Sequence, residues 1–320
     1  MSGEHTMSVE EPPPVEDSAP ARFDVRDFAR TAVGSHRDEI DLAAFETRPL
    51  EPATLRVLAY ARELERSTMT YLRNVLVTPT HKDARVTAFL TTWAFEKFWI
   101  ADAFDVIVRA HGIDPTAGPK PGRVKAFSLE VAERATPIVE AFRANSIGPD
   151  VIGLHLSSVT IDEWITEAAY TRLAELDPHP VLVALLERVQ TVKARHRLFV
   201  EVDARQRLEQ SPKARSLAKR ALPRVALPIG AASNAASETA FFYETLLDAP
   251  LADSIDDRVR SLPGLGSLHL VKTARAKALS GDKGQQNSTA SVARWIGRTT
   301  ATLTHPLHTD SPTPSTRKAD

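Results

Sequence analysis

Four long stretches of this chain carry apolar residues three and four positions apart, with proline or glycine between the stretches. This spacing places the apolar side chains on one face of an α-helix, so helices are predicted over 52–77, 83–111, 151–176 and 180–208. No stretch alternates convincingly between apolar and polar residues, the pattern of a half-buried strand. The chain is therefore predicted to be almost wholly α-helical.

The connections between these predicted helices differ greatly in length. Only a few residues join the first helix to the second and the third to the fourth, whereas residues 112–150 separate the second from the third. This long connection holds a shorter predicted helix over 125–145. Two antiparallel pairs with one long connection between them describe a ferritin-like four-helix bundle. We predict this bundle for residues 22–210.

The parts of the chain outside the predicted bundle are of two kinds. Short helical patterns at 213–222, 235–247 and 252–262 predict a C-terminal helical cap over residues 211–279. Residues 1–21 and 280–320 are rich in Pro, Ser, Thr, Gly and charge, a bias typical of disordered tails. In the second tail, Val292, Trp295 and Ile296 have the spacing of a short amphipathic turn, interpreted as either a local hydrophobic contact or a partner motif.

Charge and cysteine content limit the possible functions. The 40 Lys and Arg residues nearly balance the 41 Asp and Glu residues, so nucleic acid is not expected as a partner. The chain has no cysteine, so any metal must be held by His and carboxylates. No apolar run is long enough for a membrane span, and the N-terminus lacks the apolar core of a signal peptide. A cytoplasmic location is expected.

Each of the four long predicted helices carries a short motif of charged and aromatic residues. Di-iron carboxylate bundles place a Glu on each of two helices and a Glu-x-x-His on each of the other two, because residues three apart point the same way. In chain order the motifs here are Glu65 with Tyr71-Leu72, the run Trp93-Ala94-Phe95-Glu96-Lys97-Phe98-Trp99-Ile100, the run Asp162-Glu163-Trp164-Ile165-Thr166, and Lys193-Ala194-Arg195-His196.

In order and spacing these motifs resemble those of the acyl-acyl-carrier-protein desaturase group and its actinobacterial ferritin-like relatives. The resemblance covers roughly residues 50–270 and includes the spacer around His179-Pro180 and the later Leu262-Pro263-Gly264. It implies a di-iron site, oxidation of an acyl-type substrate by a desaturase or oxygenase reaction, and a homodimer formed through the bundle helices.

Three of the six ligand positions implied by the resemblance hold a residue that can bind metal. Glu65 matches the lone carboxylate of the first helix, with Glu63 as a neighbouring alternative, and Glu163 matches that of the third. His196 matches the histidine of the fourth helix. These three residues are the candidate metal ligands, and they would suit one iron or manganese ion.

The other three ligand positions are lost. With Trp93 as the anchor, the second helix places Lys97 and Ile100 where the family has Glu and His, and Lys193 replaces the Glu of the fourth helix. A register shifted by one residue would instead make Glu96 a ligand and put Trp99 at the histidine position. Either register leaves the second histidine missing.

The two lysines suggest why the carboxylates remain. Buried carboxylates without a metal repel one another, and an ammonium group at each lost position would neutralise them. Lys97 and Lys193 are therefore expected to form ion pairs with Glu65 and Glu163. A protonated lysine cannot ligate a metal, so the most direct interpretation includes no cofactor.

Three hypotheses for function follow. In the first, the protein keeps the fold, has lost the di-iron centre, and works by binding an apolar or acyl ligand or a partner. In the second, it is a metal-dependent oxidoreductase acting on an acyl-type or other apolar substrate. In the third, it is a metal-free enzyme in which Lys97 or Lys193 has a lowered pKa and serves as a base or forms a Schiff base.

Two further groups of residues leave alternatives open. Tyr71 and Tyr170 either donate hydrogen bonds to the carboxylates or pack with their hydroxyls satisfied by backbone. The basic stretch that contains Lys213, Arg215, Lys219 and Arg220 is either a solvated helix face or a docking site for an acidic acyl carrier protein.

Overall fold

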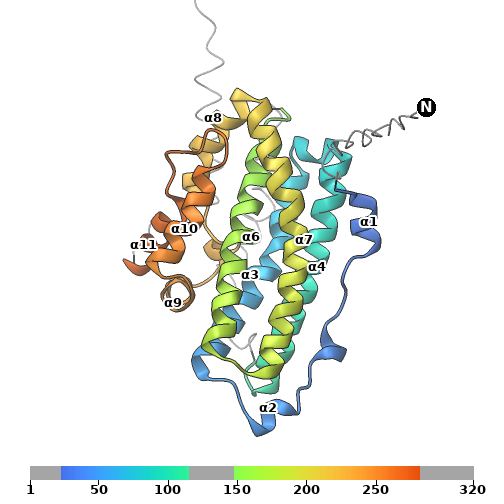
Figure 1. The fold of residues 1–320 in the computed structure, drawn as a ribbon, viewed down its shortest axis with the longest axis vertical. Coiled ribbons are helices and arrows are strands. Elements are labelled where there is room, and N and C mark those ends of the chain that lie inside the picture. Colours follow the sequence, from blue (N-terminus) through green and yellow to red (C-terminus); the bar gives the residue numbers. More distant parts are fainter. Residues whose placement is uncertain (1–22, 115–147, 282–320) are drawn as a thin grey trace, which may run out of the picture.

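A computed structural model describes residues 23–114 and 148–281. All regular secondary structure in these two ranges is helical, which confirms the all-α prediction. Figure 1 shows four long helices lying side by side: α3 (Pro52–Leu76), α4 (Ala84–Ala110), α6 (Val151–Leu176) and α7 (Pro180–Gln210). Within the described ranges, none of the helices has the length and apolar character required to cross a bilayer.

The four long helices begin and end close to the predicted positions, because local signals set their ends. Proline occupies the first helical position of α3 and of α7, where its missing amide hydrogen costs nothing. The Asp83 carboxylate accepts a hydrogen bond from the backbone of Val86 and so caps the start of α4. α6 has the predicted bounds, and the other three differ from prediction by no more than two residues.

The long helices pack as two pairs, α3 with α4 and α6 with α7. α6 is buried along most of its length, because α7 covers one side and three C-terminal helices contact others, namely α8 (Pro212–Ala221), α9 (Ala236–Leu246) and α10 (Ala249–Arg260). The apolar core runs through all four helices, and its largest fully buried side chains include Phe89, Trp93, Phe104 and Phe199. The two pairs face each other across an interior that also holds charged side chains.

An N-terminal strap, residues 23–51, lies against α4 and α7 (Figure 1). It contains α1 (Val25–Arg30), the 3-10 turn η1 (Arg37–Glu39) and α2 (Ala44–Thr47), none of which was predicted. Phe28 stacks on Phe89, and the Arg195 guanidinium donates hydrogen bonds to the Phe28 and Thr31 carbonyls. These short elements depend on contacts with the long helices, so their own sequence carries little periodic signal.

The C-terminal unit consists of α8 (Pro212–Ala221), η3 (Leu222–Arg224), η4 (Ala231–Ser233), α9 (Ala236–Leu246), α10 (Ala249–Arg260) and α11 (Leu270–Leu279). The structure contains helices at the three places predicted for the cap. The sequence did not predict α11, because the side chain that caps its first turn lies outside the helix, on α10. The buried Asp256 carboxylate of α10 accepts hydrogen bonds from the Val271 and Lys272 amides at the start of α11.

Three predictions fall largely outside the described residues. They are the disordered tail at 1–21, the helix at 125–145 and the disordered tail at 280–320, of which only Ser280 and Gly281 are described.

Candidate functional site

The four long helices bring seven ionisable side chains together in the interior. All seven are at most 2% exposed to solvent, so they interact with one another rather than with water. We call this group the charge cluster; its members are Glu65 on α3, Glu96 and Lys97 on α4, Asp162 and Glu163 on α6, and Lys193 and His196 on α7. Every sequence-predicted metal ligand and both candidate lysines belong to it.

Lys97 lies between three carboxylates at the centre of the charge cluster. Its Nζ is 2.7 Å from Glu65 Oε2 and 3.4 Å from Glu163 Oε1. The third carboxylate, Asp162, places Oδ2 3.4 Å from the same nitrogen. The ammonium group thus occupies the space between the carboxylates of α3 and α6.

Lys193 forms the second ion pair. Its Nζ donates a hydrogen bond to Glu163 Oε2 at 2.7 Å. The other oxygen of Glu163 accepts a hydrogen bond from the Trp93 indole, also at 2.7 Å. Both ion pairs expected from the two lysines are therefore present, and the Glu163 carboxylate is held from both sides.

Glu96 and His196 form a third pair, which links α4 to α7. His196 Nε2 lies 2.7 Å from Glu96 Oε2, and His196 Nδ1 lies 3.6 Å from Glu163 Oε1. The second oxygen of Glu96 accepts a hydrogen bond from the Val33 amide of the N-terminal strap at 2.7 Å. Glu96 is thus inside the charge cluster together with Lys97, although the sequence motifs placed them in alternative registers.

The aromatic residues of the motifs divide into two groups. Tyr170 donates a hydrogen bond to Glu65 Oε1 at 2.5 Å, whereas Tyr71 donates to the backbone carbonyl of His155. Tyr170 therefore binds a carboxylate of the charge cluster, whereas the hydroxyl of Tyr71 is satisfied by the backbone. Trp99 is only partly buried, and its ring packs against the exposed Phe98, so it is not in the charge cluster.

Asp162 connects the charge cluster to the C-terminal unit. Its Oδ1 accepts a hydrogen bond from the Ile229 amide at 2.8 Å. Ile229 precedes Gly230, whose φ of +94° is in the left-handed region. A Cβ at Gly230 would lie 2.5 Å from Ser67 Cβ, so glycine allows this loop to lie directly against α3. The loop therefore covers the charge cluster on the α3 and α6 side.

Burial and pairing act in opposite directions on these groups. Burial alone would lower the pKa of Lys97, but the surrounding Glu163, Glu65 and Asp162 raise it well above its ordinary value. Burial likewise opposes the charge of Glu163, yet Lys193 and Lys97 lower its pKa well below its ordinary value. For Asp162 burial dominates and raises the pKa, despite the nearby Lys97. Lys97 and Glu163 are therefore charged at neutral pH.

The di-iron group implied by the resemblance does not fit these residues. Lys97 stands between Glu65 and Glu163, which are the two carboxylates that a metal would have to share. His196 directs Nε2 toward Glu96, and Lys193 binds the outer oxygen of Glu163. An ammonium group has no lone pair to offer while it is protonated, and it repels a cation. The donor set suits ion pairing rather than metal binding.

The surroundings of Lys97 do not favour the lysine-base hypothesis. A lysine base must be neutral near pH 7, which requires a lowered pKa. The pKa of Lys97 is instead raised, once burial and the three carboxylates are both taken into account. Lys193 Nζ forms an ion pair with Glu163 Oε2 at 2.7 Å, so Lys193 is not an isolated lysine facing an open pocket.

The predicted basic stretch lies on α8, and one of its residues is used in contacts within the protein. Arg215 donates hydrogen bonds to the Leu208 and Glu209 carbonyls and so satisfies the last turn of α7. Lys219 and Arg220 are exposed. The surface that remains open to a partner is therefore smaller than the sequence suggests.

Sequence reasoning missed two parts of this site, namely Asp162 as a partner of Lys97 and the backbone amides of Val33 and Ile229 as donors to carboxylates. Asp162 was visible beside Glu163, but only the packing of the C-terminal unit gives it a role.

Comparisons of this chain with models of known families, with curated proteins and with solved structures found no match.

Proposed function

We propose that this chain is a ferritin-like, desaturase-related helical bundle in which ion pairs replace the di-iron centre, and that it acts by binding a ligand or a partner. The ferritin-like assignment rests on the order and spacing of the four motifs. The loss of the metal centre rests on the position of Lys97, whose ammonium lies between Glu65 and Glu163.

The electrostatics of the charge cluster support this proposal. Four buried carboxylates, Glu65, Glu96, Asp162 and Glu163, face two ammonium groups and one imidazole. Removing a metal from such a set would leave uncompensated buried anions, which cost several kcal/mol each. The lysines remove that penalty, so the bundle keeps its fold without needing a metal.

The decisive experiment is the metal content of the purified protein. The chain is expressed without a polyhistidine tag in medium supplemented with iron and manganese, and metals are counted by mass spectrometry. We expect a stoichiometry near zero. One or two metals per chain, lost in Glu163→Gln and His196→Ala, would contradict the proposal and favour a metal-dependent oxidoreductase acting on an acyl-type substrate.

A matched variant makes a negative result informative. Lys97→Glu, Ile100→His and Lys193→Glu together restore every ligand position implied by the resemblance. If the lysines are what exclude metal, this triple variant binds iron or manganese while the unaltered chain does not. Failure of both proteins to bind metal, with the variant folded by circular dichroism, would contradict the assignment of the four motifs to a former di-iron site.

An acidic carrier protein is the partner that the resemblance favours. Lys219 and Arg220 offer exposed positive charge on α8. We expect the double substitution Lys219→Glu and Arg220→Glu to weaken binding of an acyl carrier protein, measured by isothermal titration calorimetry. Unchanged affinity, or no binding by the unaltered chain, would mean that this face is only solvated.

A further inference from the structure

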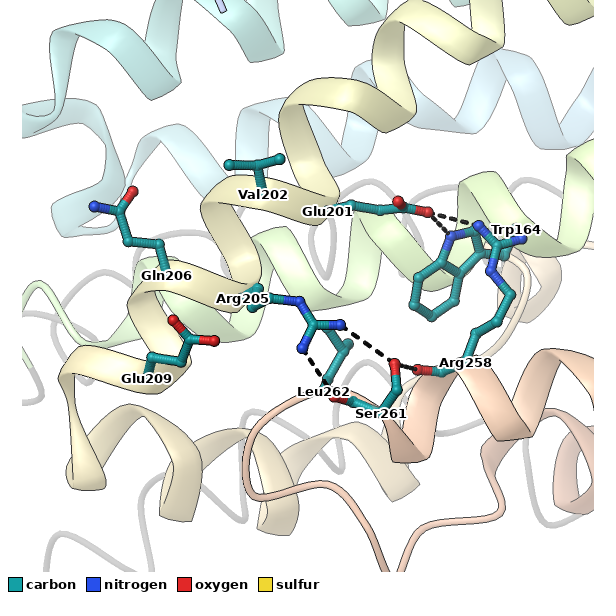
Figure 2. Close-up of a pocket in the computed structure, with 9 residues that line it drawn as sticks. All are labelled: Trp164, Glu201, Val202, Arg205, Gln206, Glu209, Arg258, Ser261 and Leu262. Carbon is teal, nitrogen blue, oxygen red and sulfur yellow. Dashed lines mark hydrogen bonds and ion pairs between the residues drawn. The ribbon is translucent and has the colours of Figure 1, made fainter. Parts of the chain in front are cut away.

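A surface groove lies between the C-terminal half of α7 and the end of α10 (Figure 2). It has a volume of about 390 Å³ and is lined by Trp164, Val202, Gln206, Glu209 and Arg258, among others. Val202 is 63% exposed, and Leu198, one turn earlier on α7, is 62% exposed. These two residues are the most exposed large apolar side chains of the described part of the chain, and they form an apolar stripe along α7 beside the groove.

The floor of the groove is held rigidly by contacts within the protein. The Arg258 guanidinium lies 4.4 Å from the centre of the Trp164 ring and donates a hydrogen bond to Glu201 at 2.6 Å. Arg205 donates to the Ser261 carbonyl at 3.0 Å. Figure 2 marks this contact with a dashed line. A binding surface that is already ordered loses little entropy when it is occupied.

Two polar side chains on the rim have no such contacts. Gln206 and Glu209 line the groove, and in the described residues no hydrogen bond or ion pair satisfies their side chains. The groove therefore offers an apolar stripe, a rigid floor and, at Glu209, a carboxylate that forms no ion pair in the described residues, while Arg205 one turn earlier is bound to Ser261. These features suit a short amphipathic segment that carries a positive charge beside its apolar face.

We propose that residues 291–298 of this same chain, with the sequence SVARWIGR, dock in this groove. Val292, Trp295 and Ile296 are three and four positions apart, so on a helix they share one face. Leu198 and Val202 have the same four-residue spacing on α7. Trp295 supplies the large anchor, because a tryptophan buries about 150–250 Å².

Arg298 of this segment has a counterpart in the groove. Arg298 follows Trp295 by three positions and so lies next to it on the same side of a helix. Its guanidinium would meet Glu209, the carboxylate on the rim without a partner in the described residues. The segment has no acidic residue that would oppose this contact.

The described chain ends close enough to the groove for this docking. Val271, at the start of α11, is hydrogen-bonded to Asp256, two residues before the groove residue Arg258. α11 spans 10 residues, or about 15 Å, so Gly281 lies about that far along the helix from Val271. Residues 282–291 could extend over about 33 Å, which is about twice the length of α11.

Disulfide trapping in the full-length chain tests this proposal, and the absence of native cysteine removes any background. Gln206→Cys and Ala293→Cys are combined, and the rate of disulfide formation under mild oxidation is followed by intact mass and peptide mapping. The matched control combines Ala293→Cys with Arg73→Cys, an exposed position on α3. Docking predicts an intramolecular disulfide that forms at least about tenfold faster in the groove pair than in the control.

A third protein separates docking from chance encounter. Trp295→Ala and Ile296→Ala are added to the groove pair, and we expect the rate to fall to that of the control. Equal rates in all three proteins would overturn the proposal. A disulfide-linked dimer would also overturn it, because the occupant would then be a second copy of the chain. None of these outcomes depends on the charge cluster, so the test is independent of the proposed function.

Discussion

Lys193 and Glu163 form an ion pair across α7 and α6, with Nζ 2.7 Å from Oε2 and both side chains 1% exposed. A pair at this depth is stable only while both partners are present, because either one alone would be an unpaired charge in a low-dielectric interior. The stability of the fold should therefore depend on this pair far more than on a pair at the surface.

Substitution of Lys193 by methionine tests this dependence. We expect Lys193→Met to lower the free energy of unfolding by about 3–5 kcal/mol, because Glu163 loses one of its two close cations. The measurement is chemical denaturation followed by circular dichroism. Lys272→Met is the matched control, since Lys272 pairs with Asp253 at 3.0 Å but is 61% exposed. It should cost less than about 1 kcal/mol, and equal losses would contradict the buried pairing.

The Lys97–Glu65 pair predicts a non-additive result. Lys97→Met alone strands Glu65 and should destabilise strongly, whereas Glu65→Gln alone leaves Lys97 its contacts with Asp162 and Glu163. The double variant should be more stable than Lys97→Met, because the glutamine still accepts the hydrogen bond from Tyr170 without a buried charge. A double-mutant cycle in urea measures the coupling, and additive losses would show that the two residues do not interact.

His155 predicts a pH dependence that is separate from the ion pairs. Its Nδ1 lies 2.9 Å from Thr80 Oγ1, and burial lowers the pKa of the imidazole to about 4 from 6.5. The unfolded chain therefore binds a proton between these two pH values while the folded chain does not, so stability falls as the pH drops from 6.5 to 4. The loss is at most about 3.5 kcal/mol, since the shift is about 2.5 pKa units and each unit corresponds to roughly 1.4 kcal/mol.

The measurement is the free energy of unfolding at several pH values for the unaltered chain and for His155→Asn. The variant should lose part of the slope in this window, and His36, whose pKa is lowered chiefly by burial, should keep the remainder. A decline at lower pH should also remain, where protonation of Glu163, whose pKa is lowered by Lys193 and Lys97 against the effect of burial, removes its ion pairs. His81→Asn, at an exposed histidine on η2 (Pro79–Lys82), is the control and should leave the slope unchanged. A slope as steep in His155→Asn as in the unaltered chain would assign it to other groups.

The stability of Gly230→Ala tests how closely the loop over the charge cluster must lie against α3. In Gly230→Ala the new Cβ would lie 2.5 Å from Ser67 Cβ, in addition to the strain of φ at +94°. Gly112→Ala has a similar strain, with φ at +75°, but nothing within 4 Å of its Cβ. Strain alone costs about 1 kcal/mol, so we expect Gly230→Ala to cost at least about 1–3 kcal/mol more in thermal or chemical denaturation.

A rescue variant shows whether the steric contact is the cause. Ser67→Gly in the Gly230→Ala background removes the atoms that the new Cβ would meet, so it should recover part of the loss despite its own cost in α3. Similar losses for Gly230→Ala and Gly112→Ala would show that the loop can move away from α3 freely.

Sequence alone determined the elements whose signals are local. α6 could be placed at Val151–Leu176 because Pro149 precedes it and the Asp177-Pro178 break follows it. The ion pairs of Lys97 and Lys193 were also predictable, since helical spacing on four long helices points these side chains to one interior. Charge neutrality then required each lysine to meet a carboxylate.

Tertiary structure alone decided the contacts made by segments without periodic pattern. The strap delivers the Val33 amide to Glu96, and the loop at Ile229 delivers its amide to Asp162, across separations of 63 and 67 residues. No local preference encodes such bonds, because they depend on where distant helices place a carboxylate that lacks a donor. For the same reason Glu96 and Lys97, adjacent in sequence and alternatives in the motif, both entered the charge cluster: Glu96 turns toward α7 and Lys97 toward α3 and α6.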